Sequence, residues 1–110
     1  MSSLKDKQVT FLKNFALLII WASENGYEVT AGELFRTEEQ HALNIKKGLT
    51  KAKRSKHQDR LAGDLNLFIK GVYQTGKEPY KPLAVKWKSL HPDNVAGYDW
   101  GWDANHFEMK

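Results

Sequence analysis

The run from Leu61 to Phe68 is the feature that most constrains the fold of this chain. Residues of one parity in this run are leucine or glycine, and those of the other parity include Ala62, Asp64 and Asn66. Alternate residues of a β-strand point to opposite faces of the sheet. The run therefore predicts a strand whose leucines enter a core, while Asp64 points into a cleft on the other face.

Length and composition limit the chain to one small domain, spanning residues 1–110. The sequence has 110 residues, of which 41% are apolar, enough for a single modest core. It has no cysteine, so disulfides and thiolate metal sites are excluded. The formal charge of +4 suits nucleic acid and equally an anionic cell wall, and charge alone does not choose between them.

The apolar run from Phe15 to Ala22 follows several lysines and has some features of a signal peptide. The run is short, Asp6 lies in the segment that should be basic, and no small-residue cleavage site follows. It also fits the wide buried face of an amphipathic helix. We therefore expect a core helix here, no signal peptide and no membrane-spanning segment.

Hydrophobic spacing and capping signals predict three helices and three strands. Thr37 and Gln40 form a capping box, Pro82 suits a first helical turn, and Gly26 and Gly48 suit helix ends. The expected helices span 3–25, 37–47 and 82–90, and the expected strands span 27–35, 61–73 (with a bend near Gly71) and 106–109. An aromatic turn is expected over 98–102.

Two histidines and an aspartate are candidate metal ligands. His57 lies seven residues before Asp64, in a polar loop that can fold back on the strand. Imidazole and carboxylate are zinc ligands, and His106 near the end of the chain offers a third. Three protein ligands with an open fourth position are typical of a catalytic zinc site, so we expect one Zn²⁺ ion at His57, Asp64 and His106.

These residues also carry a family resemblance. The pattern Ser55-x-His57-x6-Asp64, followed by Asp103-x-x-His106, resembles the two motifs of the VanY-like zinc D-alanyl-D-alanine carboxypeptidases. That family includes the phage L-alanyl-D-glutamate endolysins. Residues 34–40 resemble its RT-x-x-Q segment, and Trp100-Gly101-Trp102 resembles the residues before its last motif. One departure is clear, because Arg60 stands where the family has glycine.

The resemblance implies a small antiparallel sheet with about three helices on one side and zinc on the open side, an α+β fold. It also implies roles for single residues. Asp103 would be the general base, Arg36 would contact the substrate and hold the developing oxyanion, and Ser55 would hydrogen-bond the substrate. We expect Trp102 to contact substrate beside Trp100, with at least one of these two rings in the core.

Three further residues have supporting or neutral roles in this interpretation. Glu108 shares strand parity with His106, so we expect it to support that ligand or to form a salt bridge. His41 and His91 match no motif, and we expect both on the surface.

The function implied by the resemblance is hydrolysis of an amide bond in the stem peptide of bacterial peptidoglycan. We expect an L-alanyl-D-glutamate endopeptidase first and a D,D-carboxypeptidase or dipeptidase second. We expect the protein to be a monomeric phage or prophage endolysin that stays in the host cytoplasm until its release. It would need no nucleic acid and no stable membrane association.

Two functions of other classes remain open. One is a zinc domain that binds without catalysis. The other is a basic nucleic-acid-binding domain, because seven basic residues and a single acid lie between positions 46 and 60. That segment is equally consistent with a solvent-exposed loop that has no binding function. The basic residues are Lys46, Lys47, Lys51, Lys53, Arg54, Lys56 and Arg60.

Overall fold

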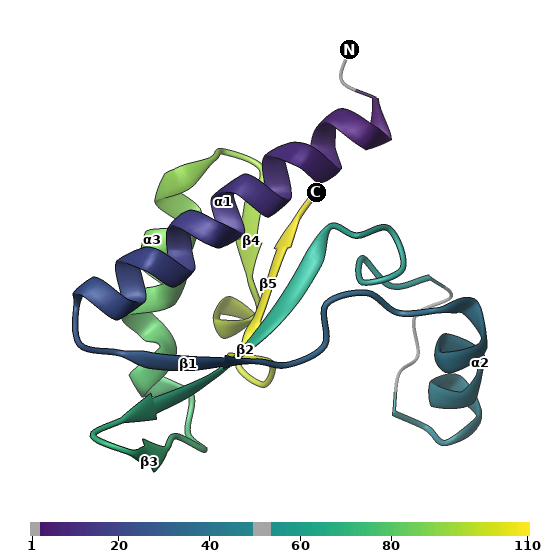
Figure 1. The fold of residues 1–110 in the computed structure, drawn as a ribbon. Coiled ribbons are helices and arrows are strands. Elements are labelled where there is room, and N and C mark those ends of the chain that lie inside the picture. Colours follow the sequence, from purple (N-terminus) through teal and green to yellow (C-terminus); the bar gives the residue numbers. More distant parts are fainter. Residues whose placement is uncertain (1–2, 50–53) are drawn as a thin grey trace.

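The computed structural model describes residues 3–49 and 54–110, which form an α+β domain (Figure 1). The predicted fold class is confirmed. The elements, with η marking short 3-10 helices, are α1 (Leu4–Glu24), β1 (Glu28–Ala31), α2 (Glu38–Lys46), β2 (Ala62–Ile69), β3 (Val72–Tyr73), η1 (Glu78–Tyr80), α3 (Lys81–Leu90), β4 (Asn94–Ala96), η2 (Gly97–Trp100) and β5 (His106–Met109).

The strands pair antiparallel in the order β1-β2-β5-β4, and β3 pairs with the end of β2. Lys70 and Gly71 connect β2 to β3 with φ angles of 51° and 80°. Positive φ at both residues of a two-residue loop matches the twist of a hairpin. The bend predicted near Gly71 is therefore a tight turn, which divides the single strand expected over 61–73 into two.

Helices α1 and α3 form the core with the sheet. Trp87 of α3 packs edge-on against Phe11 of α1 and Phe107 of β5, with ring centroids 5.5 Å and 6.1 Å apart. The helical spacing predicted for the first helix is observed in its buried apolar residues, which are Phe11, Phe15, Leu18 and Ala22. The apolar run that has signal-peptide features is thus part of this core.

The two faces of β2 differ as the alternation predicted. Leu65 and Leu67 are buried, whereas Asp64 is half-buried. A Cβ atom added at Gly63 would lie 2.7 Å from the Phe15 ring, so this parity of β2 faces α1. Asp64 therefore points to the sheet face that is open.

Helix α2 begins as predicted, because the Thr37 hydroxyl accepts a hydrogen bond of 3.0 Å from the Gln40 N–H. Figure 1 shows α2 set apart from the layer of α1 and α3.

The strand predicted over 27–35 is shorter, because the chain leaves regular pairing after Ala31. Strand β4 was not predicted, since its three residues follow a segment that has turn signals. Lys51 and Lys53 lie outside the described residues.

None of the helices in the described part of the chain is both long enough and apolar enough to cross a membrane.

Candidate metal centre

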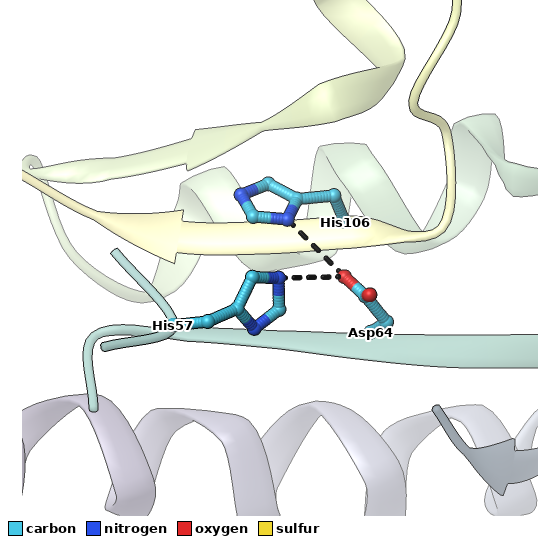
Figure 2. Close-up of side chains that lie close together, drawn as sticks. All are labelled: His57, Asp64 and His106. Carbon is cyan, nitrogen blue, oxygen red and sulfur yellow. Dashed lines mark hydrogen bonds and ion pairs between the residues drawn. The ribbon is translucent and has the colours of Figure 1, made fainter. Parts of the chain in front are cut away.

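Three predicted ligands meet on the open face of the sheet. Figure 2 shows the side chains of His57, Asp64 and His106 pointing toward one another. The Asp64 Oδ1 atom lies 3.4 Å from His57 Nε2 and 3.1 Å from His106 Nδ1. One ligand atom from each residue lies within 4.8 Å of the other two. Three residues that are distant in the sequence, with Asp64 and His106 separated by 42 positions, thus form one cluster that could hold a metal ion.

The backbone fixes the position of each of these side chains. Asp64 of β2 is paired directly with His106 of β5, so their side chains leave the same face side by side. His57 lies in the turn before β2, where its carbonyl accepts hydrogen bonds from the N–H groups of Arg36 and Arg60 at 3.2 Å and 3.3 Å. The metal cluster therefore depends on one strand pair and one hydrogen-bonded turn.

The outer nitrogen of each histidine has its own partner. His57 Nδ1 lies 3.3 Å from the carbonyl oxygen of Leu34, and His106 Nε2 lies 2.8 Å from a carboxylate oxygen of Glu108. If only these outer atoms carry an N–H, as in a metal-bound histidine, His57 Nε2 and His106 Nδ1 each present a lone pair toward the same point as Asp64. Such outer partners orient metal-binding histidines and raise their basicity. The residues present fit a divalent ion, and Glu108 has the supporting position predicted for it.

The carboxylates of the site change the acidity of the groups around them. Burial lowers the pKa of His106, but hydrogen bonds to Asp64 and Glu108 outweigh burial and raise that pKa to about 9. Burial raises the pKa of Asp64, yet hydrogen bonds from His106 and His57 bring it below its ordinary value. A cluster in which several carboxylates surround two imidazoles favours a bound cation.

Asp103 reaches the same cluster through a tight turn. Its carbonyl accepts a hydrogen bond of 3.0 Å from the His106 N–H, and its Oδ2 atom lies 3.8 Å from His106 Nδ1. Burial raises the pKa of Asp103, with the neighbouring His106 charge acting in the opposite direction. A carboxyl group with a raised pKa is better able to exchange a proton near neutral pH.

Arg36 lines the cleft, but its donors are already engaged. Its Nε atom donates to Glu33 Oε1 at 2.9 Å, and its Nη1 atom lies 3.0 Å from His41 Nδ1. The Arg36 side chain is only 13% exposed. Prediction of His41 as a surface group was wrong, because it is 3% exposed and packs beside this arginine. Helix α2 turns that face inward, and no short-range pattern in the sequence indicates it.

Glu33 is a site residue that the sequence interpretation missed. Its Oε1 atom lies 3.6 Å from His57 Nε2. Its carbonyl accepts a hydrogen bond of 2.9 Å from the Asp64 N–H, which holds the segment after β1 against β2. The available signal was its position three residues before Arg36, the spacing of an ion pair. The sequence predicted a strand over 27–35, and residues three positions apart on a strand point to opposite faces, so this ion pair was not expected.

Ser55 and Arg60 shape the loop that carries His57. The Ser55 hydroxyl accepts a hydrogen bond of 3.1 Å from the His57 N–H. Arg60, at the family's glycine position, has a φ of 57°, a left-handed conformation that favours glycine. Its guanidinium lies 4.1 Å from the centroid of the Phe35 ring, a cation–π contact. The arginine thus keeps the backbone conformation of the turn while adding a contact.

The two tryptophans border the cleft, and neither is in the core. Trp100 is 41% exposed and Trp102 is 78% exposed, so the expectation that one would be buried was wrong. The Trp100 ring lies 5.3 Å from His106 and 6.1 Å from Trp102, between centroids.

His91 is half-buried, and its Nδ1 atom accepts a hydrogen bond from the Asp93 N–H. The cleft around the metal cluster has a volume of about 440 Å³.

No protein-family model and no curated protein matches this sequence. Among solved structures, the chain is similar to the crystal structure of the L-Ala D-Glu endopeptidase ChiX of Serratia marcescens, with a TM-score of 0.74 and 18% sequence identity. The match covers 96% of this chain and 85% of that one. This likeness agrees with the resemblance carried by the motifs, and this chain has the same fold as that L-Ala D-Glu endopeptidase.

Proposed function

We propose that this protein is a zinc-dependent peptidase that cleaves the stem peptide of bacterial peptidoglycan, with the L-alanyl-D-glutamate bond as its substrate. The observation that carries this proposal is the convergence of His57, Asp64 and His106, with Asp103 3.8 Å from His106. The similar fold of an L-Ala D-Glu endopeptidase gives further support.

The ligand set of two imidazoles and one carboxylate is typical of a catalytic zinc site. A bound zinc ion would lower the pKa of a coordinated water toward ~7 and polarise the scissile carbonyl. Asp103 would then take a proton from the attacking water and give it to the leaving amine. Arg36 would hold Glu33 beside His57, and Trp102 at the rim would pack against the peptide.

For Arg36 to contact the oxyanion directly, its present hydrogen bonds to Glu33 and His41 would have to rearrange. Ser55 would contact the substrate beside the metal while it keeps the turn closed. We further propose that the protein acts as a monomeric phage or prophage endolysin, which stays in the host cytoplasm until it reaches the wall.

Digestion of purified peptidoglycan, followed by mass spectrometry of the fragments, tests this function. We expect two products. In one, L-alanine remains attached to muramic acid and ends in a free carboxylate; the other is a peptide with D-glutamate at its new N-terminus. EDTA should abolish the cleavage, and Zn²⁺ should restore it. Release of terminal D-alanine would indicate a carboxypeptidase instead. Absence of cleavage by the zinc-loaded protein, together with salt-sensitive DNA binding that survives EDTA, would contradict the proposal.

A further inference from the structure

Three basic side chains in the described residues line the metal cleft, and two of them are engaged. Arg36 donates to Glu33 and contacts His41. Arg54 binds Asp59 through Nε and Nη2, each 2.7 Å from the carboxylate oxygen Oδ1. Each of these two arginines is oriented by an acidic partner whose carboxylate offsets its charge.

Lys56 is the third cation, and its side chain has no ion-pair or hydrogen-bond partner among residues 3–49 and 54–110. It is half-buried in the wall of the cleft. Its carbonyl accepts two backbone hydrogen bonds, from Leu61 N–H at 3.0 Å and from Asp59 N–H at 3.1 Å. The backbone of Lys56 is therefore fixed next to His57, while no side chain in the described ranges 3–49 and 54–110 pairs with its ammonium group.

The lining of the cleft also contains three acidic side chains. They belong to Asp64, Asp103 and Glu108, and each lies close to His106. An anionic substrate would meet repulsion from carboxylates that the bound ion does not neutralise. Among the described residues, Lys56 is the one lysine or arginine of this lining without an acidic partner, so its ammonium group gives such a substrate a favourable place for its negative charge.

We propose that Lys56 binds the free α-carboxylate of the D-glutamate residue on the leaving side of the scissile bond. This inference rests on the proposed function. When D-glutamate is linked through its side chain, its α-carboxylate is attached to the carbon bonded to the scissile nitrogen. The charge therefore enters the cleft together with the scissile bond. A lysine ammonium is a compact charge that can pair with this carboxylate.

The experiment compares two synthetic stem peptides that differ only at this group, one with the free α-carboxylate and one with the α-amide. With zinc-loaded parent protein, we expect kcat/KM for the acid to exceed that for the amide by tenfold or more. Lys56→Met should lower kcat/KM for the acid alone and bring the ratio close to one. Lys56→Arg should keep most of the preference. Lys13→Met, the same change on the exposed face of α1, should leave both values unchanged.

Zinc content and the far-UV circular dichroism spectrum of each variant show whether the site and fold remain intact. If Lys56→Met does not fold, the parent alone gives a second measurement, because its preference should fall as ionic strength rises. Equal cleavage of both peptides by the parent, or an unchanged ratio in Lys56→Met, would overturn the role of Lys56 only. No cleavage of either peptide by the parent would overturn the proposed function as well.

Discussion

Asp64 and His106 stand opposite each other on β2 and β5, and their side chains meet with 3.1 Å between Oδ1 and Nδ1. A slip of β2 by one residue against β5 would turn Asp64 toward α1 and the core, away from His106. The buried leucines of β2 prevent that shift, because it would expose them. The geometry of the metal centre is therefore tied to the register of the hydrophobic core.

Removing a predicted ligand should abolish metal binding. His106→Ala deletes a ligand atom from a three-residue set, so we expect the affinity for Zn²⁺ to fall by at least ~100-fold, because the loss exceeds that of an outer partner. Isothermal titration calorimetry of the metal-free protein checks this. His91→Ala is the matched control, since His91 lies outside the cluster and contacts the Asp93 backbone. Equal zinc binding by the two variants would refute the ligand assignment.

Asp103→Asn should keep the fold and the metal but lose hydrolysis. The amide is nearly the same size as the carboxylate, yet it cannot take up a proton. We expect kcat to fall by roughly 10²- to 10⁴-fold, the usual contribution of a general base. The measurement is a turbidity assay on permeabilised bacteria, with zinc content determined on the same sample. Lysis at the parental rate would exclude Asp103 as the base.

The stability of the metal-free protein should depend on pH through His106. Its pKa in the folded chain is raised to about 9 from 6.5, so the protonated form stabilises the fold. This contribution is complete below about pH 6.5 and is lost as the pH rises through about 9; it amounts to at most about 3 kcal/mol.

Urea unfolding in EDTA at pH 6, 8 and 10 measures this change. His106→Gln should flatten the pH dependence, because the titrating group is removed while a polar side chain remains. A parent protein whose unfolding free energy falls no more than that of His106→Gln would contradict the expectation.

Gly97→Ala should disturb the turn that carries Asp103. A Cβ atom at position 97 would lie 1.9 Å from the Asp103 carbonyl oxygen, and a backbone atom cannot move aside as a flexible side chain can. We expect a loss of roughly 1–3 kcal/mol in stability and a decrease in hydrolysis. Gly76→Ala is the control, since a Cβ there meets nothing within 4 Å. Thermal unfolding of both variants checks the contrast, and equal midpoints would contradict it.

Arg36→Lys should test the pair with Glu33. A lysine keeps the charge but cannot reproduce the fixed pair of donations that Nε and Nη2 of the guanidinium make to Glu33 Oε1. Glu33 would then be less firmly held 3.6 Å from His57 Nε2. We expect hydrolysis to fall about tenfold or more while zinc remains bound, which kinetics and metal analysis together measure. Unchanged hydrolysis would show that the position of Glu33 is not important for the reaction.

Local patterns in the sequence determined much of this protein. The alternation in residues 61–67 predicted which face of β2 is buried, because a strand has a period of two. The helix starts at Ser3 and Thr37 were predictable because each hydroxyl accepts a backbone N–H three residues later. Residue types and spacing made His57, Asp64 and His106 candidate ligands, and the family resemblance supplied most of the support for choosing them. The structure brings all three together.

Only the tertiary structure decided the surroundings of those ligands. Glu33 lies beside His57 because the chain leaves β1 early and is held to Asp64 by a backbone hydrogen bond, an interaction across 31 positions. Burial of His41 and exposure of Trp100 and Trp102 also depend on which segments cover them. The physical reason is that periodicity and capping act over a few residues, whereas burial and ion pairing depend on segments that are distant in the sequence.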